Sequence, residues 1–246
     1  MADVIPDSDM QQVPEDWRRA LAVVAHPDDL EYGAAAAIAR WTDQGKTVVY
    51  CLVTSGEAGI DSMAPDEAAR MRQEEERRSA SVVGVDVVEF LNHPDGLVEN
   101  TLMLRRDLTA AIRRHTPDVI ISMNFHDSWG PTGYSNHADH RATGRAVLDA
   151  VRDASNRWLF VGAGGAPWSG VRFAVFNGSP FATHWVDTAA TIDRGVASLA
   201  EHAGYLAALP EGTTGKDPEP FIRGMGQQTG ARFGVGAATT FELVEM

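Results

Sequence analysis

Apolar residues along this 246-residue chain follow two alternating spacings. Short and almost wholly apolar runs are typical of strands covered on both faces, whereas apolar residues spaced three and four apart are typical of amphipathic helices. The runs that predict strands cover residues 20–25, 47–54, 86–91, 118–123, 171–176, 185–186 and 239–244. Helical spacing is found over residues 30–41, 66–83, 104–112, 142–151 and 192–206.

This alternation of strand and helix predicts an α/β protein with a mostly parallel central sheet and helices on both faces. A chain of this length is commonly one domain. Residues 1–16 are acidic, contain two prolines and precede the first apolar run, so we expect them to form an N-terminal arm. The domain itself is then expected over residues 17–246. Residues 162–170 and 211–219 are rich in glycine or proline and are expected to be loops.

The charge and cysteine content of the chain argue against several kinds of binding partner and metal site. The chain has 34 acidic and 21 basic residues, a formal charge of −13, so nucleic acid and anionic membranes are poor partners. A single cysteine, Cys51, excludes an intrachain disulfide and a cysteine-rich zinc site. No stretch resembles a signal peptide or a transmembrane helix, and we therefore expect a cytoplasmic protein. Whether the protein forms a homo-oligomer is left open.

Two polar clusters directly follow predicted strands. The first strand runs into His26-Pro27-Asp28-Asp29, and the fourth leads through a loop into His137-Ala138-Asp139-His140. Ligands bind at the carboxyl ends of the strands in open parallel sheets. The two clusters should therefore converge if both strands lie near the centre of the sheet.

The residue types in these clusters suit a catalytic zinc ion. Such sites use three imidazole or carboxylate ligands and leave one position for water, whose pKa the ion lowers. A neighbouring carboxylate that does not bind the ion can act as general base. Either aspartate of the first cluster, and either histidine of the second, could be the ligand.

Each cluster alone has a simpler interpretation. His-Pro-Asp is a common turn whose aspartate caps the next helix, and His-x-x-His is often solvated. Both clusters, however, lie between a predicted strand and a predicted helix, and together they supply a complete catalytic set. This joint placement favours an enzyme.

The sequence resembles the LmbE-like or PIG-L-like N-acetylglucosamine de-N-acetylases. The likeness rests on Ala25-His26-Pro27-Asp28-Asp29-Leu30-Glu31 and on His137-Ala138-Asp139-His140-Arg141-Ala142-Thr143-Gly144. Weaker matches lie at residues 54–59, 72–75 and 83–96, so that the likeness spans residues 19–151. Tyr134 stands three residues before His137, where some members place a tyrosine two residues before it.

The resemblance implies a Rossmann-like three-layer fold and a zinc-dependent hydrolase. Its substrate would be a small N-acetylated amino sugar or glycoconjugate, from which zinc-bound water removes the acetyl group. Ferrous iron suits the same ligands. By position, the implied metal ligands are His26, Asp29 and His140.

The resemblance also implies roles beyond the metal. Asp28 would be the general base, His137 would stabilise the oxyanion, and Asp139 would tune His137. Arg72 and Asp95 match positions that hold the sugar in family members, although Arg72 could equally be a solvated helix residue. His93, His126, His184 and His202 are expected to be structural or surface residues.

Two other functions compete with deacetylation. One is a zinc-dependent amidase acting on a thiol or sugar conjugate other than an acetamide. The other is a non-catalytic carbohydrate-binding protein on the same fold. Binding alone does not require a general base, so the complete set of polar residues argues against the second.

Overall fold

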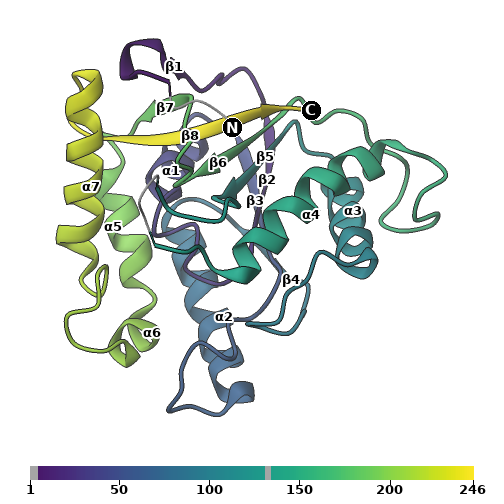
Figure 1. Cartoon of the computed structure of the whole chain (residues 1–246), viewed down its shortest axis with the longest axis horizontal. Helices are drawn as coiled ribbons and strands as arrows, with labels where there is room; N and C mark the ends of the chain where they lie inside the picture. The colour runs from purple at the N-terminus through teal and green to yellow at the C-terminus, as the bar shows by residue number, and fades with distance from the viewer. Residues whose placement is uncertain (1–4, 131–133) are drawn as a thin grey trace.

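A computed structural model describes residues 5–130 and 134–246 (Figure 1). One eight-stranded sheet forms the centre, in the order β1-β7-β8-β6-β5-β2-β3-β4. The strands are β1 (Gln11–Gln12), β2 (Arg19–Val24), β3 (Thr47–Leu52), β4 (Val87–Phe90), β5 (Val119–Met123), β6 (Phe173–Asn177), β7 (His184–Asp187) and β8 (Ala238–Glu245). The helices are η1 (Asp7–Asp9), α1 (Ala35–Asp43), α2 (Pro65–Val82), α3 (Leu102–His115), α4 (Ala138–Ser155), α5 (Ile192–Ala200), α6 (Ala203–Ala208) and α7 (Pro218–Phe233).

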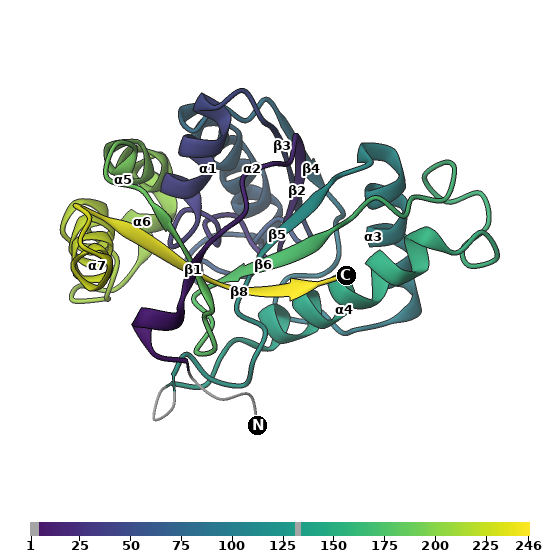
Figure 2. The same ribbon diagram turned by 90° about the horizontal axis from the view of Figure 1, so that it is seen from above.

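The sheet is mostly parallel, which confirms the predicted α/β class. Only β8, among the described strands, runs antiparallel to its two neighbours. Helices α3 and α4 cover one face, and α1, α2, α5 and α7 lie on the other side (Figure 2). None of the helices described is long and apolar enough to cross a bilayer.

Strand β2 shows why a central strand of this sheet is a continuous run of apolar residues. Successive side chains point to opposite faces. Leu21 and Val23 pack in the cluster that includes α3 and α4, whereas Ala22 and Val24 pack with α1 and α2. Both faces therefore need apolar residues, and the run becomes continuously apolar rather than alternating.

Strands β2 and β5 are neighbours, as the convergence of the two polar clusters requires. Their parallel register pairs Ala20 with Val119 and Ala22 with Ile121. The hydroxyl of Ser122 also donates a hydrogen bond of 2.7 Å to the Val23 carbonyl. The predicted convergence at the carboxyl edge is thus confirmed.

The N-terminal segment adds to the sheet. Within the expected arm, Gln11–Gln12 forms β1, which pairs in parallel with β7. Val13 is buried and Trp17 packs edge-on against Trp41. A two-residue strand is too short to leave a hydrophobic period, so the pattern could not predict it.

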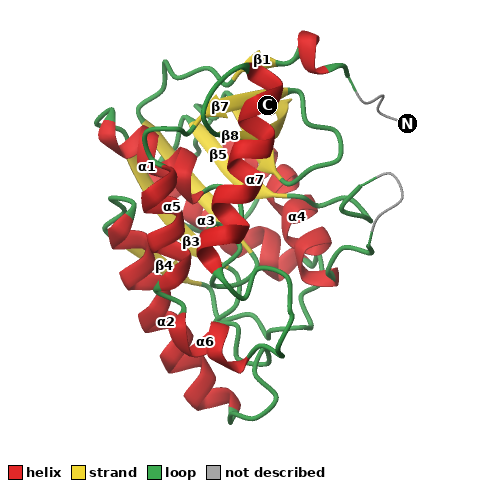
Figure 3. Ribbon diagram, turned by 90° about the vertical axis from the view of Figure 1, so that its left-hand side faces the viewer, coloured by secondary structure: helices red, strands yellow, loops and turns green. Residues whose placement is uncertain are grey.

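The C-terminal half departs most from the prediction. The expected helix over 192–206 is broken into α5 and α6, and α7 was not predicted at all. In α7 the buried positions include two glycines, Gly226 and Gly230. A Cβ at Gly230 would lie 2.6 Å from the Val235 carbonyl oxygen, so this helix packs through its backbone rather than an apolar stripe. Figure 3 shows α5 and α7 side by side at this end of the molecule.

Helix α4 carries the second polar cluster at its N-terminus, and a glycine lets it pack closely against the loop after β5. Gly144 is buried one turn after His140, and a Cβ there would lie 2.3 Å from the Cβ of Phe125. Because Phe125 lies two residues after the end of β5, this contact sets the distance between α4 and the end of β5.

We therefore expect Gly144→Ala to destabilise the fold by about 1–3 kcal/mol, since the new methyl group overpacks a contact near the backbone. Gly224→Ala is a matched control, because Gly224 is also helical but has no atom within 4 Å of its would-be Cβ. The control should gain about 0.5–1 kcal/mol from helix propensity. Denaturant unfolding measures both values, and changes of the same sign would contradict the packing role of Gly144.

Candidate metal centre and pocket

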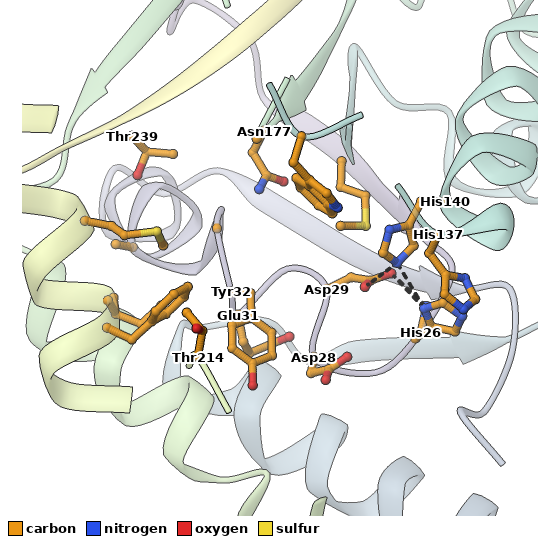
Figure 4. Close-up of a pocket in the computed structure, with 18 of the residues that line it drawn as sticks. His26, Asp28, Asp29, Glu31, Tyr32, His137, His140, Asn177, Thr214 and Thr239 are labelled. Atoms are coloured by element: carbon orange, nitrogen blue, oxygen red, sulfur yellow. Dashed lines mark hydrogen bonds and ion pairs between the residues drawn. The ribbon is translucent and has the colours of Figure 1, made fainter. Parts of the chain in front are cut away.

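A pocket of about 920 Å³ opens at the carboxyl edge of the sheet. Its wall contains residues of the two polar clusters together with residues from the C-terminal half (Figure 4). Figure 4 places His26, His137 and His140 at one end and Thr214 and Thr239 at the other. The two motifs thus meet in a cavity large enough for a ligand.

The first cluster forms a strained turn. Asp28 has φ of 95°, a conformation that costs a residue other than glycine about 1–3 kcal/mol and that concentrates at functional sites. In this turn the side chain of Asp29 points toward His26 and His140, whereas that of Asp28 points away from them (Figure 4). The adjacent carboxylates therefore occupy different environments, as the sequence predicted.

Three side chains place potential metal ligands together. The Nε2 atom of His140 lies 3.2 Å from Nδ1 of His26 and 3.1 Å from Oδ1 of Asp29, and His26 Nδ1 lies 3.6 Å from Asp29 Oδ2. Ligands bound at about 2.0–2.2 Å to one tetrahedral ion would be about 3.3–3.6 Å apart. The spacing of His26, Asp29 and His140 therefore fits a divalent metal ion.

The outer ring nitrogens are held by further partners. His140 Nδ1 lies 2.9 Å from the side-chain oxygen of Asn136, and His26 Nε2 lies 3.2 Å from carboxylate oxygens of both Asp139 and Asp95. When these outer nitrogens donate, the inner nitrogens keep their lone pairs for a metal ion. Such support is typical of histidine ligands.

The charge around His26 also favours a cation. Burial lowers the pKa of His26, but the carboxylates of Asp29, Asp139 and Asp95 together hold this pKa well above its usual value. Burial raises the pKa of Asp29, yet His140 and His26 hold it well below the usual range. The site is thus a negative environment that a metal ion would neutralise.

His137 gives a second candidate for the third ligand. Ring nitrogens of His26, His137 and His140 lie within 4.8 Å of one another. His137 is half exposed, and its Nδ1 accepts the backbone N–H of Asp139 at 3.2 Å as the cap of α4. Its remaining proton therefore sits on Nε2, which makes the ring a donor toward the pocket.

Asp28 is buried beside a cation. Its Oδ1 lies 3.2 Å from Nη2 of Arg72, and the nearby Tyr205 hydroxyl lowers the pKa of Asp28 further. Burial, opposed by Arg72 and reinforced by the charge of Asp29, raises the pKa of Asp28 to about 6. A carboxyl poised near neutrality is what general base catalysis requires.

The two residues expected to hold the sugar both reach the pocket. The guanidinium of Arg72 is buried and donates to the carbonyls of Pro27 and Gly56, so it is not a solvated helix residue. Asp95 faces His26 with one oxygen and accepts the Ala58 N–H at 2.8 Å with the other. Contact of Arg72 or Asp95 with a sugar stays a prediction. Tyr134 is 87% exposed at the pocket rim.

Several residues that surround the site were not predicted from the sequence. Asn136 directly precedes the second cluster and could have been suspected from that position alone. Tyr205, from α6, gave no signal because it belongs to no motif and its helix was not separated from α5. The same holds for Trp129, whose ring lies edge-on to His140 at 5.9 Å.

The geometry defines an α/β protein with a candidate metal centre of two imidazoles and one carboxylate, next to a separate buried carboxylate. A family model described as GlcNAc-PI de-N-acetylase (PIG-L) matches residues 21–151. The chain belongs to this family.

Named relatives are deacetylases. The diacetylchitobiose deacetylase of Thermococcus kodakarensis is 34% identical over 138 residues, which cover 55% of this chain and 50% of that protein. The 1D-myo-inositol 2-acetamido-2-deoxy-alpha-D-glucopyranoside deacetylase of Kineococcus radiotolerans is 31% identical over 186 residues, covering 61% and 49%. The chain thus spans about half the length of these curated relatives.

A solved structure extends the likeness to the whole fold. The N,N'-diacetylchitobiose deacetylase of Pyrococcus horikoshii, complexed with its inhibitor MPG, superposes with a TM-score of 0.81 and 26% identity. The match covers 94% of this chain and 85% of that one. The single α/β domain is therefore the fold of this deacetylase.

Metal affinity should show whether His137 binds the ion, as His140 is expected to do. We expect His140→Ala to weaken zinc binding at least about 100-fold, because it would remove one of three ligands. His137→Ala should change the affinity by less than about tenfold. Competition titration against a chromophoric chelator measures both, and equal losses would make His137 a ligand.

Proposed function

We propose that this protein is a metal-dependent deacetylase that releases acetate from small N-acetylated amino sugars, with zinc as its ion. The observation that carries the proposal is that two adjacent aspartates have different surroundings. Asp29 faces His26 and His140, whereas Asp28 is turned away toward Arg72 and has a raised pKa. A carbohydrate-binding protein would gain nothing from a buried, strained carboxylate with that pKa.

The metal ligands in this proposal are His26, Asp29 and His140. An ion held there would polarise the acetamide carbonyl and lower the pKa of a bound water. Asp139 is hydrogen-bonded to His26 and lies 3.9 Å from His137. It would therefore orient a metal ligand and also raise the pKa of His137 against the effect of burial, which lowers it.

Asp28 would move a proton, and His137 would stabilise the developing negative charge. Asp28 takes a proton from the attacking water as the new carbon–oxygen bond forms. His137 donates a hydrogen bond from Nε2 to the carbonyl oxygen as that oxygen gains negative charge, and it keeps its proton. Asp28 then returns its proton to the amine nitrogen as the carbon–nitrogen bond breaks, which leaves acetate and a free amine.

Asp28→Asn tests the role of the base. Asparagine tolerates positive φ, so the turn should fold as before. We expect kcat for acetate release to fall by about 10²–10⁴-fold with zinc content unchanged, because only proton transfer is lost. Enzymatic acetate detection and elemental analysis on the same preparation give both values. Loss of zinc in this variant would make Asp28 a ligand instead.

The far end of the pocket suggests what else the substrate carries. Tyr32, Ile192, Phe221, Ile222 and Met225 line it, and Tyr32 packs edge-on to Phe221 at 5.7 Å. A pocket of 920 Å³ lies near the top of the roughly 300–1,000 Å³ range for drug-sized ligands, and exceeds what one sugar fills. We infer that the amino sugar bears an apolar aglycone.

Apolar N-acetylglucosaminides should therefore be better substrates than free N-acetylglucosamine. We expect Phe221→Ala to lower kcat/KM about tenfold for an octyl glycoside, because the alkyl chain loses buried contact, with little change for the free sugar. Trp158→Ala is the control, since Trp158 is 79% exposed and does not line the pocket. Equal losses for both substrates would contradict an aglycone site. Turnover of other amides but of no acetamide would support the competing amidase.

A further inference from the structure

Three buried side chains that the proposed reaction does not use meet behind Asp28. They are Glu31, Glu76 of α2 and His202, which precedes α6; each is at most 1% exposed. Their potential ligand atoms lie within 4.8 Å of one another. His202 Nε2 is 3.8 Å from Glu31 Oε2 and 3.6 Å from Glu76 Oε2.

These side chains lack the hydrogen bonds that burial demands. Among the described residues, no partner bonds to Glu31 Oε2, to Glu76 Oε1 or to either ring nitrogen of His202, and the buried Tyr50 hydroxyl nearby is also unpartnered. Each orphaned polar atom costs about 1–3 kcal/mol. Two of the orphaned atoms, Glu31 Oε2 and His202 Nε2, face each other at 3.8 Å inside the cluster, which indicates a missing ligand between them rather than a packing defect.

A proton shared within the cluster does not explain the spacing. A protonated carboxyl would donate to His202 at about 2.7–3.0 Å, whereas the separations are 3.6 and 3.8 Å. Ligands around a common ion at about 2.0–2.2 Å would be about 3.3–3.6 Å apart. The cluster has almost that spacing.

The charge of a bound ion would suit the cluster. Two buried carboxyl groups must either keep their protons or lie beside positive charge. Arg72, the nearby cation, is already paired with Asp28. Two ionised carboxylates and a neutral imidazole would balance a bound dication with no net charge left over.

We propose that Glu31, Glu76 and His202 bind a second divalent transition-metal ion, distinct from the one held by His26, Asp29 and His140. The oxygen and nitrogen donors suit zinc or manganese. The three side chains are closed to solvent, so a substrate could not reach the ion, and its role would be structural. It would tie α2 and the start of α6 to the turn of Asp28, whose backbone N–H donates to Glu76 at 3.2 Å.

Metal counting on the full chain tests this site independently of catalysis. Protein stripped with a chelator, resaturated with zinc and desalted should hold two ions per chain by elemental analysis. The double variant His26→Ala/His140→Ala should hold one, and its zinc X-ray absorption should show a single imidazole. If the protein proved to have no deacetylase activity, the zinc content expected for the double variant would be unchanged. The two proposals can therefore be tested separately.

A matched pair of glutamates assigns the second ion. Glu76→Gln should lose one zinc, whereas Glu75→Gln should keep both, because Glu75 is also buried in α2 but bonds to Gly204 outside the cluster. If Glu76→Gln does not fold, the double histidine variant still decides: zinc should raise its Tm by several degrees. No ion in the double histidine variant, or no loss of zinc in Glu76→Gln relative to the wild type, would overturn the proposal.

Discussion

The site depends on the parallel pairing of β2 with β5. This pairing brings two motifs that are far apart in sequence to one edge of the sheet, each at the carboxyl end of its strand. The register is specified by burial on both faces, since Ile120 packs toward α3 and α4 while Ile121 packs toward α1 and α2. A slip by one residue would reverse these faces and move the loop that carries His140 along the strand. The apolar core therefore sets the metal–ligand geometry.

Helix α2 then holds the strained turn in place. Arg72 and Glu76 lie four residues apart on the same buried face of α2. Their side chains contact the strained loop at Asp28 from two sides. Arg72 donates to the carbonyl of Pro27, and Glu76 accepts the N–H of Asp28. The cost of the positive φ at Asp28 is offset by these charged hydrogen bonds. Arg72 also lowers the pKa of Asp28 against the larger effect of burial, so helix α2 both supports the strained turn and adjusts the proposed base.

The sequence predicted the parallel sheet and the convergence of the motifs, because these follow from hydrophobic period and from the position of the motifs after strands. Residue type alone left both aspartates and both histidines open as ligands, and only the resemblance singled out His26, Asp29 and His140. It could not predict that α2 buries its charges. A helix rich in Glu and Arg reads as solvated, and only the tertiary fold places Arg72 and Glu76 against the turn. Helix α7 was missed for the opposite reason, since its close contacts are made at Gly226 and Gly230, which carry no apolar signal.

The part of the chain beyond the family match, residues 152–246, does more than line the distant end of the pocket. Tyr205 lies near Asp28 and lowers its pKa, and His202 completes the cluster with Glu31 and Glu76. Both residues lie at or within α6, between the helices that form the apolar end of the pocket. A substitution that shifts α6 to enlarge the apolar end of the pocket must therefore also change the surroundings of Asp28. The shape of the pocket and the pKa of Asp28 are in this way physically coupled, although the motifs that define the family lie elsewhere in the chain.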